Sequence, residues 1–132
     1  LITNARRGSI AAMGSHIALI GMSYKPNSHV LDDSQSVALL NLLYKYKFKV
    51  KWFDPLVRAE AIPQAPKVNA FVDCIKDAGV VVALHPTLYG HTAQEIDEAV
   101  LPGGGFVDVW RLCKPSWFKQ AKYFPFGNVK AI

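Results

Sequence analysis

The sequence lacks the features that mark several large classes of protein. No apolar run approaches the roughly 20 residues that cross a bilayer, and residues 1–16 lack the apolar core of a secretion signal. Only two cysteines occur in 132 residues, Cys74 and Cys113, too few for a disulfide framework or a zinc site. We therefore expect no membrane partner, no metal, and a reducing, cytoplasmic location.

Basic residues are also too dispersed for a nucleic-acid-binding surface. The chain has 15 Lys and Arg against 10 Asp and Glu, a net charge of +5. Its densest basic stretch, the four lysines between residues 45 and 51, alternates along the approach to a strand, which is typical of a solvated face. We expect no nucleic acid as a partner, although the charge suits a small phosphate-bearing ligand.

The glycine-rich fingerprint of a dinucleotide-binding loop is missing too. That fingerprint needs three glycines after the first strand, whereas Gly21 is followed by Met-Ser-Tyr. Asp54 ends the second strand, but it lies well beyond the spacing of about 20 residues expected for a ribose-binding acid. Together with Pro55 it is more typical of a turn. We therefore expect no cofactor cradle in this chain.

The remaining pattern alternates short apolar runs with helical periodicities. This alternation predicts an α/β fold of the three-layer, Rossmann-like kind, with a mainly parallel open sheet and helices on both faces. The expected strands cover residues 17–21, 50–53, 80–84, 106–109 and 123–126, and the expected helices cover 34–46, with Asp33 or Ser34 as cap, 73–78, 93–100 and 115–121.

Two cations follow strands of this expected sheet. Lys25 comes after the first strand and Arg111 after the fourth. Ligands of open α/β sheets bind at the carboxyl ends of the strands, and a lysine with an arginine suits a diphosphate or a carboxylate. The alternatives are a solvated loop lysine and a surface salt bridge from Arg111 to Asp108. His85, which follows the third strand, is equally compatible with a ligand contact and with a plain loop residue.

The cysteines and the first helix complete the local predictions. Cys74 and Cys113 are best interpreted as small buried thiols rather than nucleophiles, although cations near Cys113 could lower its pKa. Residues 37–43 are apolar almost all round, which favours burial against a partner. That partner would be another domain or a second copy of the chain, unless Asn41 and Lys45 supply enough polar face.

At this point the sequence resembles a known family. Residues 21–28 (Gly-Met-Ser-Tyr-Lys-Pro-Asn-Ser), residues 50–55 and residues 106–108 resemble the C-terminal, UDP-sugar-binding domain of the UDP-glucose/GDP-mannose dehydrogenase family, as a divergent branch. The resemblance implies that residues 16–132 form this domain. It also implies that residues 1–15 are the end of an interdomain helix or linker, or residues added for expression.

The resemblance also implies a function. Members of the family oxidise C6 of a UDP- or GDP-sugar with NAD, for polysaccharide biosynthesis, using an NAD domain and a catalytic cysteine that precede this region. This chain is therefore expected to bind the nucleotide sugar and not to catalyse alone, with the main NAD site outside it. Its substrate-binding residues would be Lys25, Arg111, Tyr24, Asn27 and Ser34, with Arg111 one place beyond the family's arginine. We expect a homo-oligomer, such as a dimer.

Departures from the family pattern keep two alternatives open. Asp32 stands where the family has an arginine, and Val109-Trp110 replace the family's Gly-Arg. An aspartate there would repel a pyrophosphate, which indicates an altered substrate or a weakened site. One alternative is a stand-alone oligomeric binding or assembly module that kept the fold without activity. The other is a domain for a different small ligand, such as a coenzyme, which the missing glycines disfavour.

Overall fold

The computed structural model describes residues 15–126. Of the segment expected to be an interdomain helix end, a linker or added residues, 1–15, all but Ser15 lies outside this range. A single open sheet of five strands, ordered β2-β1-β3-β4-β5, runs through this region, and every ladder in it is parallel. The strands are β1 (Ile17–Ile20), β2 (Val50–Phe53), β3 (Val80–Ala83), β4 (Gly105–Asp108) and β5 (Lys122–Pro125). The expected parallel α/β sheet is confirmed.

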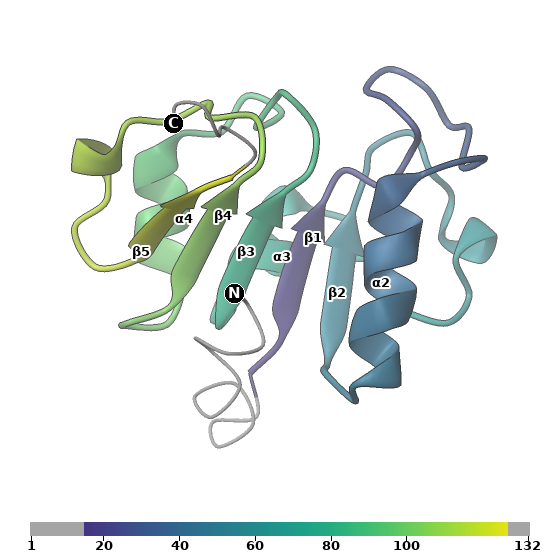
Figure 1. Ribbon diagram of the computed structural model, residues 1–132, viewed down its shortest axis with the longest axis horizontal. Coiled ribbons are helices and arrows are strands. Elements are labelled where there is room, and N and C mark those ends of the chain that lie inside the picture. The colour runs from purple at the N-terminus through teal and green to yellow at the C-terminus, as the bar shows by residue number, and fades with distance from the viewer. Residues whose placement is uncertain (1–14, 127–132) are drawn as a thin grey trace.

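Helices cover both faces of the sheet, as expected for three layers. Figure 1 shows α2 (Gln35–Lys45) in front of the sheet, with α3 (Phe71–Ile75) and α4 (Ala93–Ala99) behind it. Two single 3-10 turns, η1 (Ala59–Ala61) and η2 (Pro115–Trp117), lie in the connections. None of the described helices is long and apolar enough to cross a membrane.

The central strands are apolar on both sides because they are buried on both sides. In β1, Ile17 and Leu19 face the cluster that includes α2, whereas Ala18 and Ile20 face the cluster that includes α3 and α4. All four are fully buried. Such continuous apolar runs are characteristic of strands inside a parallel sheet, which is why these strands could be located from the sequence.

Helix α2 begins at a cap that also ties it to the loop after β1. The Ser34 hydroxyl accepts a hydrogen bond from the Val37 amide at 3.2 Å and donates one to the Met22 carbonyl at 2.6 Å. The expected cap and helix are confirmed. Leu40 and Leu43 face the core, whereas Leu42 remains 49% exposed.

The free edge of β2 is covered by a short segment of the chain rather than by another strand. The Trp52 amide donates to the Pro66 carbonyl at 3.3 Å, and the Val68 amide donates to the Trp52 carbonyl at 3.1 Å. Lys67 lies opposite Trp52 in this single parallel bridge, and its ammonium sits 5.7 Å from the indole centroid.

Two expected helices differ from the structure. The helix expected at 73–78 is α3, two residues earlier, and the one expected at 115–121 is the single turn η2. A buried carboxylate explains the second difference. Asp97 of α4 accepts hydrogen bonds from the amides of Lys119, Gln120 and Ala121 at 2.7 to 3.3 Å. Those amides are then unavailable to continue a helix from Pro115.

The Asp97 clamp predicts an acid-dependent loss of stability. Burial alone would raise the pKa of Asp97, but the hydrogen bonds from residues 119–121 outweigh it and hold the pKa below its ordinary value. A depressed folded-state pKa stabilises the fold above the unfolded-state pKa, near 4, and this contribution is lost as the pH falls through the folded-state value.

We expect Asp97→Asn to lower the free energy of unfolding by about 1–2 kcal/mol at pH 7. The difference from the wild type should shrink below about pH 4. Urea unfolding of both proteins between pH 3 and 7 measures it. A difference that does not change with pH would contradict the assigned role of the carboxylate.

Candidate functional site

The strand order itself indicates where a ligand belongs. From β1 the chain moves outward to β2, and then returns to place β3 on the other side of β1. The carboxyl ends of β1 and β3 therefore form the topological switch point, where open α/β sheets place their ligands. The loop that carries Lys25 leaves β1 at this point, and Leu84 and His85 leave β3 there.

Internal hydrogen bonds give the Lys25 loop a defined shape. The Tyr24 amide donates to the Val30 carbonyl at 2.7 Å, which closes the loop. The Ser23 hydroxyl donates to the carbonyl of Lys25 at 2.6 Å. Asn27 takes the left-handed conformation, with φ at 62°, which asparagine tolerates better than most residues. Tyr24, Lys25 and Asn27 are all exposed, so their side chains are accessible from solvent.

The base of this loop is held by Asp54, which the sequence suggested was only a turn residue. One oxygen of its buried carboxylate, Oδ2, accepts the amides of Met22 at 2.8 Å and Ser23 at 3.0 Å. The other, Oδ1, accepts the Leu56 amide at 3.0 Å. Asp54 therefore makes the expected turn and also connects the end of β2 to the loop after β1.

His85 holds the same loop from the other side, across the switch point. Its Nε2 lies 3.1 Å from the Ser23 carbonyl and so donates to it, while Nδ1 is hydrogen-bonded to the Tyr89 hydroxyl. The ring lies directly against Gly21, where a β-carbon would come within 2.5 Å of it. His85 is therefore a structural clamp with both ring nitrogens engaged, which answers the question that the sequence left open.

A second buried aspartate shapes the loop after β4. The Asp108 carboxylate accepts the amides of Leu112 and Cys113, both at 2.9 Å, and the Tyr123 hydroxyl at 2.7 Å. Arg111, at the tip of this turn, has a left-handed φ of 55° and an exposed side chain. It makes no salt bridge with Asp108 within residues 15–126, because that carboxylate is fully buried among these donors.

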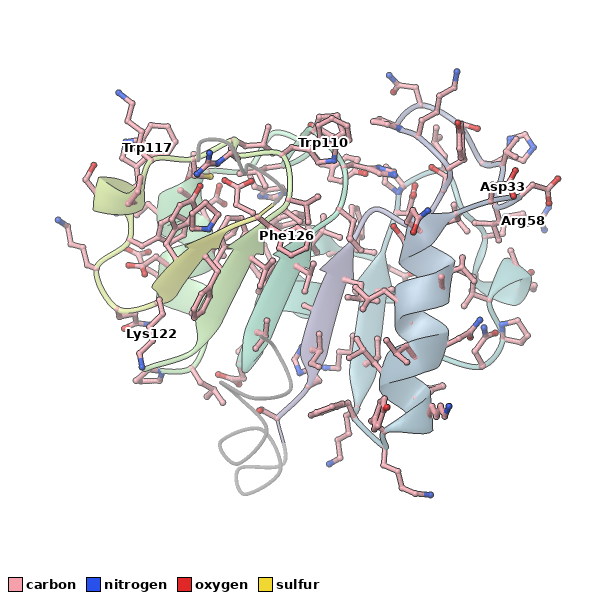
Figure 2. The ribbon with its side chains drawn as sticks, viewed as in Figure 1. Asp33, Arg58, Trp110, Trp117, Lys122 and Phe126 are labelled. Carbon is pink, nitrogen blue, oxygen red and sulfur yellow. The ribbon has the colours of Figure 1, made fainter. Side chains whose placement is uncertain are left out.

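The cations expected at the site do share one edge of the sheet, on either side of the end of β3. Ser34 is less accessible than the other expected site residues. It is buried as the α2 cap, and its hydroxyl is already hydrogen-bonded to Met22 and Val37. A further residue at this edge, Trp110, was noted in the sequence only as a departure from the family pattern. Trp110 is 56% exposed and donates its indole N–H to the Leu84 carbonyl at 3.0 Å. Figure 2 shows it beyond the carboxyl ends of the strands.

Neither cysteine is arranged as a nucleophile. Burial raises the pKa of Cys74 to about 12. Burial and the neighbouring Asp108 raise the pKa of Cys113 to about 11, so the expected effect of nearby cations is outweighed. Both thiols are free and buried, as expected, and thiols with raised pKa values are poorly reactive near neutral pH. No group of metal-binding side chains was found among the described residues.

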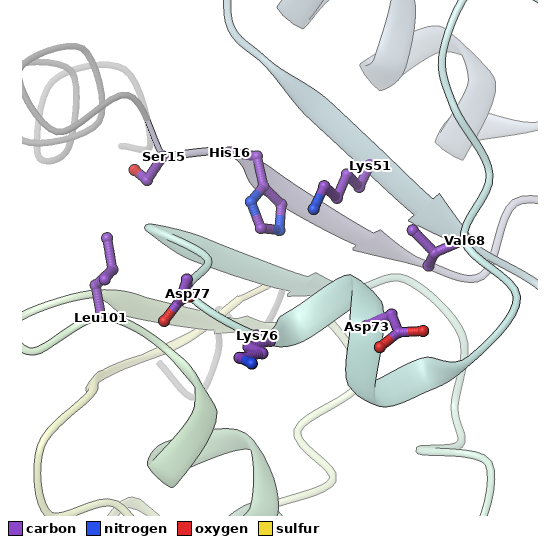
Figure 3. A pocket seen from close by; sticks show the side chains of 8 residues that line it. All are labelled: Ser15, His16, Lys51, Val68, Asp73, Lys76, Asp77 and Leu101. Carbon is purple, nitrogen blue, oxygen red and sulfur yellow. The ribbon is translucent and has the colours of Figure 1, made fainter.

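A cavity of about 750 Å³ lies at the opposite, amino-terminal edge of the sheet. Figure 3 shows Ser15 and His16 ahead of β1, with Lys51, Lys76, Asp73 and Asp77 around them. Burial lowers the pKa of His16, which favours its neutral form. The two lysines and two aspartates then balance, so this cavity offers no net charge to attract a diphosphate. The carboxyl edge remains the candidate site.

Comparison with known proteins identifies the family of the chain. The sequence profile described as "UDP-glucose/GDP-mannose dehydrogenase family, UDP binding domain" matches residues 18–115. The chain belongs to this family. It corresponds to the family's UDP binding domain, and that region includes both the Lys25 loop and Arg111.

The chain is also similar to individual dehydrogenases. The UDP-glucose 6-dehydrogenase of Rhizobium meliloti (strain 1021) is 33% identical over 64 residues, which are 48% of this chain and 14% of that protein. The UDP-N-acetyl-mannosamine dehydrogenase of Staphylococcus aureus superposes with a TM-score of 0.70 at 19% identity, over 98% of this chain and 31% of its own. The NDP-N-acetyl-D-galactosaminuronic acid dehydrogenase of Methanosarcina mazei Go1 gives 0.75 at 18%, over 96% and 28%. These structures show a shared fold, and this chain spans less than a third of each.

The family depends on NAD, but the described residues of this domain do not fit a dinucleotide. The first turn after β1 is where a Rossmann domain presents free amides and a helix N-terminus to a pyrophosphate. Here the Met22 and Ser23 amides are already bound to Asp54. A second anion at these amides would meet the Asp54 carboxylate.

Proposed function

We propose that this chain binds the nucleoside diphosphate of a nucleotide sugar at the carboxyl edge of its sheet, as the substrate-binding part of an NAD-dependent nucleotide-sugar 6-dehydrogenase. The observation that carries the proposal is the Lys25 loop. It leaves the topological switch point, is clamped by Asp54 and His85, and presents an exposed lysine. A fixed loop exposes a cation without the entropy cost of ordering it on binding.

The two cations have different roles in this proposal. β1 and β4 are separated only by β3, so the loops that carry Lys25 and Arg111 start about 10 Å apart, or two strand spacings. That separation suits an extended ligand. Lys25 would contact the phosphates as a point charge, and Arg111 would offer its fork to a phosphate or sugar oxygen. Tyr24 and Asn27 would line the loop, and Ser34 would support it from below.

The chemistry itself is proposed to lie outside this chain. The buried, high-pKa thiols of Cys74 and Cys113 are unsuited to attack a substrate, and Asp54 occupies the amides where a pyrophosphate would dock. NAD and the catalytic cysteine would belong to a companion domain, and the ligand would lie between the two. Two free thiols are compatible with a cytoplasmic location.

Lys25→Ala and Arg111→Ala are each expected to weaken binding of UDP about tenfold, since each removes a charge-assisted contact worth about 1.4 kcal/mol. The affinity of the wild type for UDP should also fall as the salt concentration is raised, because salt screens exposed charges. Amide NMR titration of this chain with UDP, UDP-glucose, GDP-mannose and NAD measures both effects. Lys122→Ala is the matched control, because Lys122 is exposed at the opposite end of β5.

Shifts with one sugar nucleotide that cluster near Lys25 and Arg111 would also identify the base. Equal affinities in the wild type and both variants would contradict the proposal.

A second candidate function is oligomeric assembly. It rests on α2 and its end, where Leu42 is 49% and Tyr46 is 60% exposed, one helical turn apart. A second copy or a companion domain would cover them. Sedimentation of the wild type and of Leu42→Lys separates the two candidates: assembly through α2 predicts a dimer that the variant loses, with UDP affinity unchanged in the variant.

A further inference from the structure

Trp110 is the largest exposed side chain at the candidate site, and it is held in place. Its indole N–H donates to the Leu84 carbonyl at 3.0 Å, although 56% of the residue remains exposed. This bond lies where the β3–β4 ladder ends, just beyond the hydrogen bond from the Val109 amide to the Ala83 carbonyl at 3.4 Å. The indole therefore binds a backbone carbonyl just beyond the end of β3.

The backbone on both sides of Trp110 is also fixed. The Asp108 carboxylate accepts the amides of Leu112 and Cys113, which lie two and three residues after Trp110. The Asp108 carbonyl accepts the amides of Arg111 at 3.4 Å and Phe126 at 3.0 Å. An exposed aromatic ring with a fixed backbone and an anchored N–H loses little freedom when it is covered, and such pre-organised rings are favourable binding surfaces.

The position of the ring suggests what covers it. Trp110 bonds to the end of β3, beside the switch point, with the Lys25 loop after β1 on one side and Arg111 as its own neighbour on the other. Figure 2 shows it over the carboxyl ends of the central strands. Two cations with an aromatic surface beside them suit a nucleotide, because its phosphates are anionic and its base has a face to stack.

We propose that Trp110 is the platform on which the base of the bound nucleotide stacks. This inference rests on the proposed function, because it takes the phosphates to lie near Lys25 and Arg111. Every base has a π face, so stacking on an indole contributes affinity without choosing between bases. The choice of uracil or guanine would then fall to polar groups around the platform, and removal of Trp110 should weaken UDP and GDP alike.

The test uses ligands that contain or lack each part of the nucleotide sugar. Calorimetric titration of the whole chain with UDP, UDP-glucose and inorganic pyrophosphate compares the wild type with Trp110→Ala and Trp110→Phe. Trp117→Ala is the matched control, because Trp117 is 46% exposed but belongs to η2, away from the central strands. Amide spectra of each variant confirm that the fold is intact.

We expect Trp110→Ala to weaken UDP and UDP-glucose by the same factor, about tenfold, and pyrophosphate by less than twofold. Trp110→Phe, which keeps a ring but loses the anchoring N–H, should fall between the wild type and Trp110→Ala. Trp117→Ala should leave all three affinities unchanged. Loss of UDP-glucose affinity alone would overturn the inference in favour of sugar stacking.

The remaining outcomes separate the two proposals. Unchanged UDP affinity in Trp110→Ala, or an equal loss for pyrophosphate, would overturn the stacking role and leave the proposed function standing. If the wild type binds pyrophosphate as tightly as UDP, the stacking role is likewise overturned and the proposed function still stands. Wild-type protein that binds none of the three ligands would overturn the proposed function and this inference with it.

Discussion

Gly21→Ala should destabilise the protein more than the same substitution at Gly90 or Gly103, the other described glycines with positive φ. The backbone at Gly21 has φ at +97°, where an L side chain is strained. The new β-carbon would also lie 2.5 Å from the His85 ring, which cannot retreat without breaking its bonds to Ser23 and Tyr89. We expect a loss of about 3–4 kcal/mol from strain and overpacking together.

The chain offers a matched control for this prediction. Gly90 has a similar φ, +85°, but open space where its β-carbon would lie. Gly90→Ala should therefore cost only the backbone strain, about 1–2 kcal/mol. Urea unfolding of both variants isolates the clash with the imidazole. Adding His85→Ala to Gly21→Ala should recover part of the loss, and equal stabilities of the two glycine variants would disprove the contact.

Asp54→Ala is expected to affect both stability and ligand affinity. The substitution leaves the buried amides of Met22 and Ser23, and the amide of the exposed Leu56, without their acceptor. Because a buried unsatisfied donor costs about 1–3 kcal/mol, and water would satisfy some of these, we expect a loss of about 3 kcal/mol. UDP affinity should fall as well, since the Lys25 loop loses the bonds at its base.

A milder variant separates the two effects of Asp54. Asp54→Asn keeps the shape, but it offers one acceptor oxygen and turns an N–H group toward the remaining donors. We expect a folded protein with a looser Lys25 loop, faster hydrogen exchange at Met22 and Ser23, and weaker UDP binding. Asp73→Asn, an exposed aspartate on α3, is the control. Unchanged UDP affinity in a folded Asp54→Asn protein would show that the loop does not need this clamp.

The elements that the sequence located well are those whose cause is local. β1 and β3 are continuous apolar runs buried on both faces, and Ser34 caps α2 through its own side chain. The elements that differ depend on distant contacts. β4 begins at Gly105, one residue before the strand expected at 106–109. A β-carbon on Gly104 beside it would come within 2.8 Å of the Gly79 carbonyl. Nothing in the residues near 104 indicates that approach.

The candidate site was likewise predicted only in part from the sequence. The general rule for parallel sheets was enough to predict that Lys25 and Arg111 follow strand ends at one edge. The residues that fix their loops were missed, because Asp54 and His85 act on backbone 31 and 62 positions away in the chain. An aspartate before a proline is typical of a turn, and Asp54 does make one to Leu56. Its second oxygen has a separate role that only the pairing of β1 with β2 reveals.

The segment that covers the edge of β2 has a consequence for how this domain meets other chains. A parallel sheet with bare edges can grow by accepting a strand from a neighbouring molecule, which leads to aggregation. Residues 66–68 already use the outward-facing amide and carbonyl of Trp52, and Pro66 has no amide to offer.

At the other edge, β5 ends in Pro125 and begins with the exposed Lys122, two residues that discourage strand addition. Partners of this domain should therefore attach through side chains at strand ends or on helices, and the sheet should stay five strands wide even at high protein concentration.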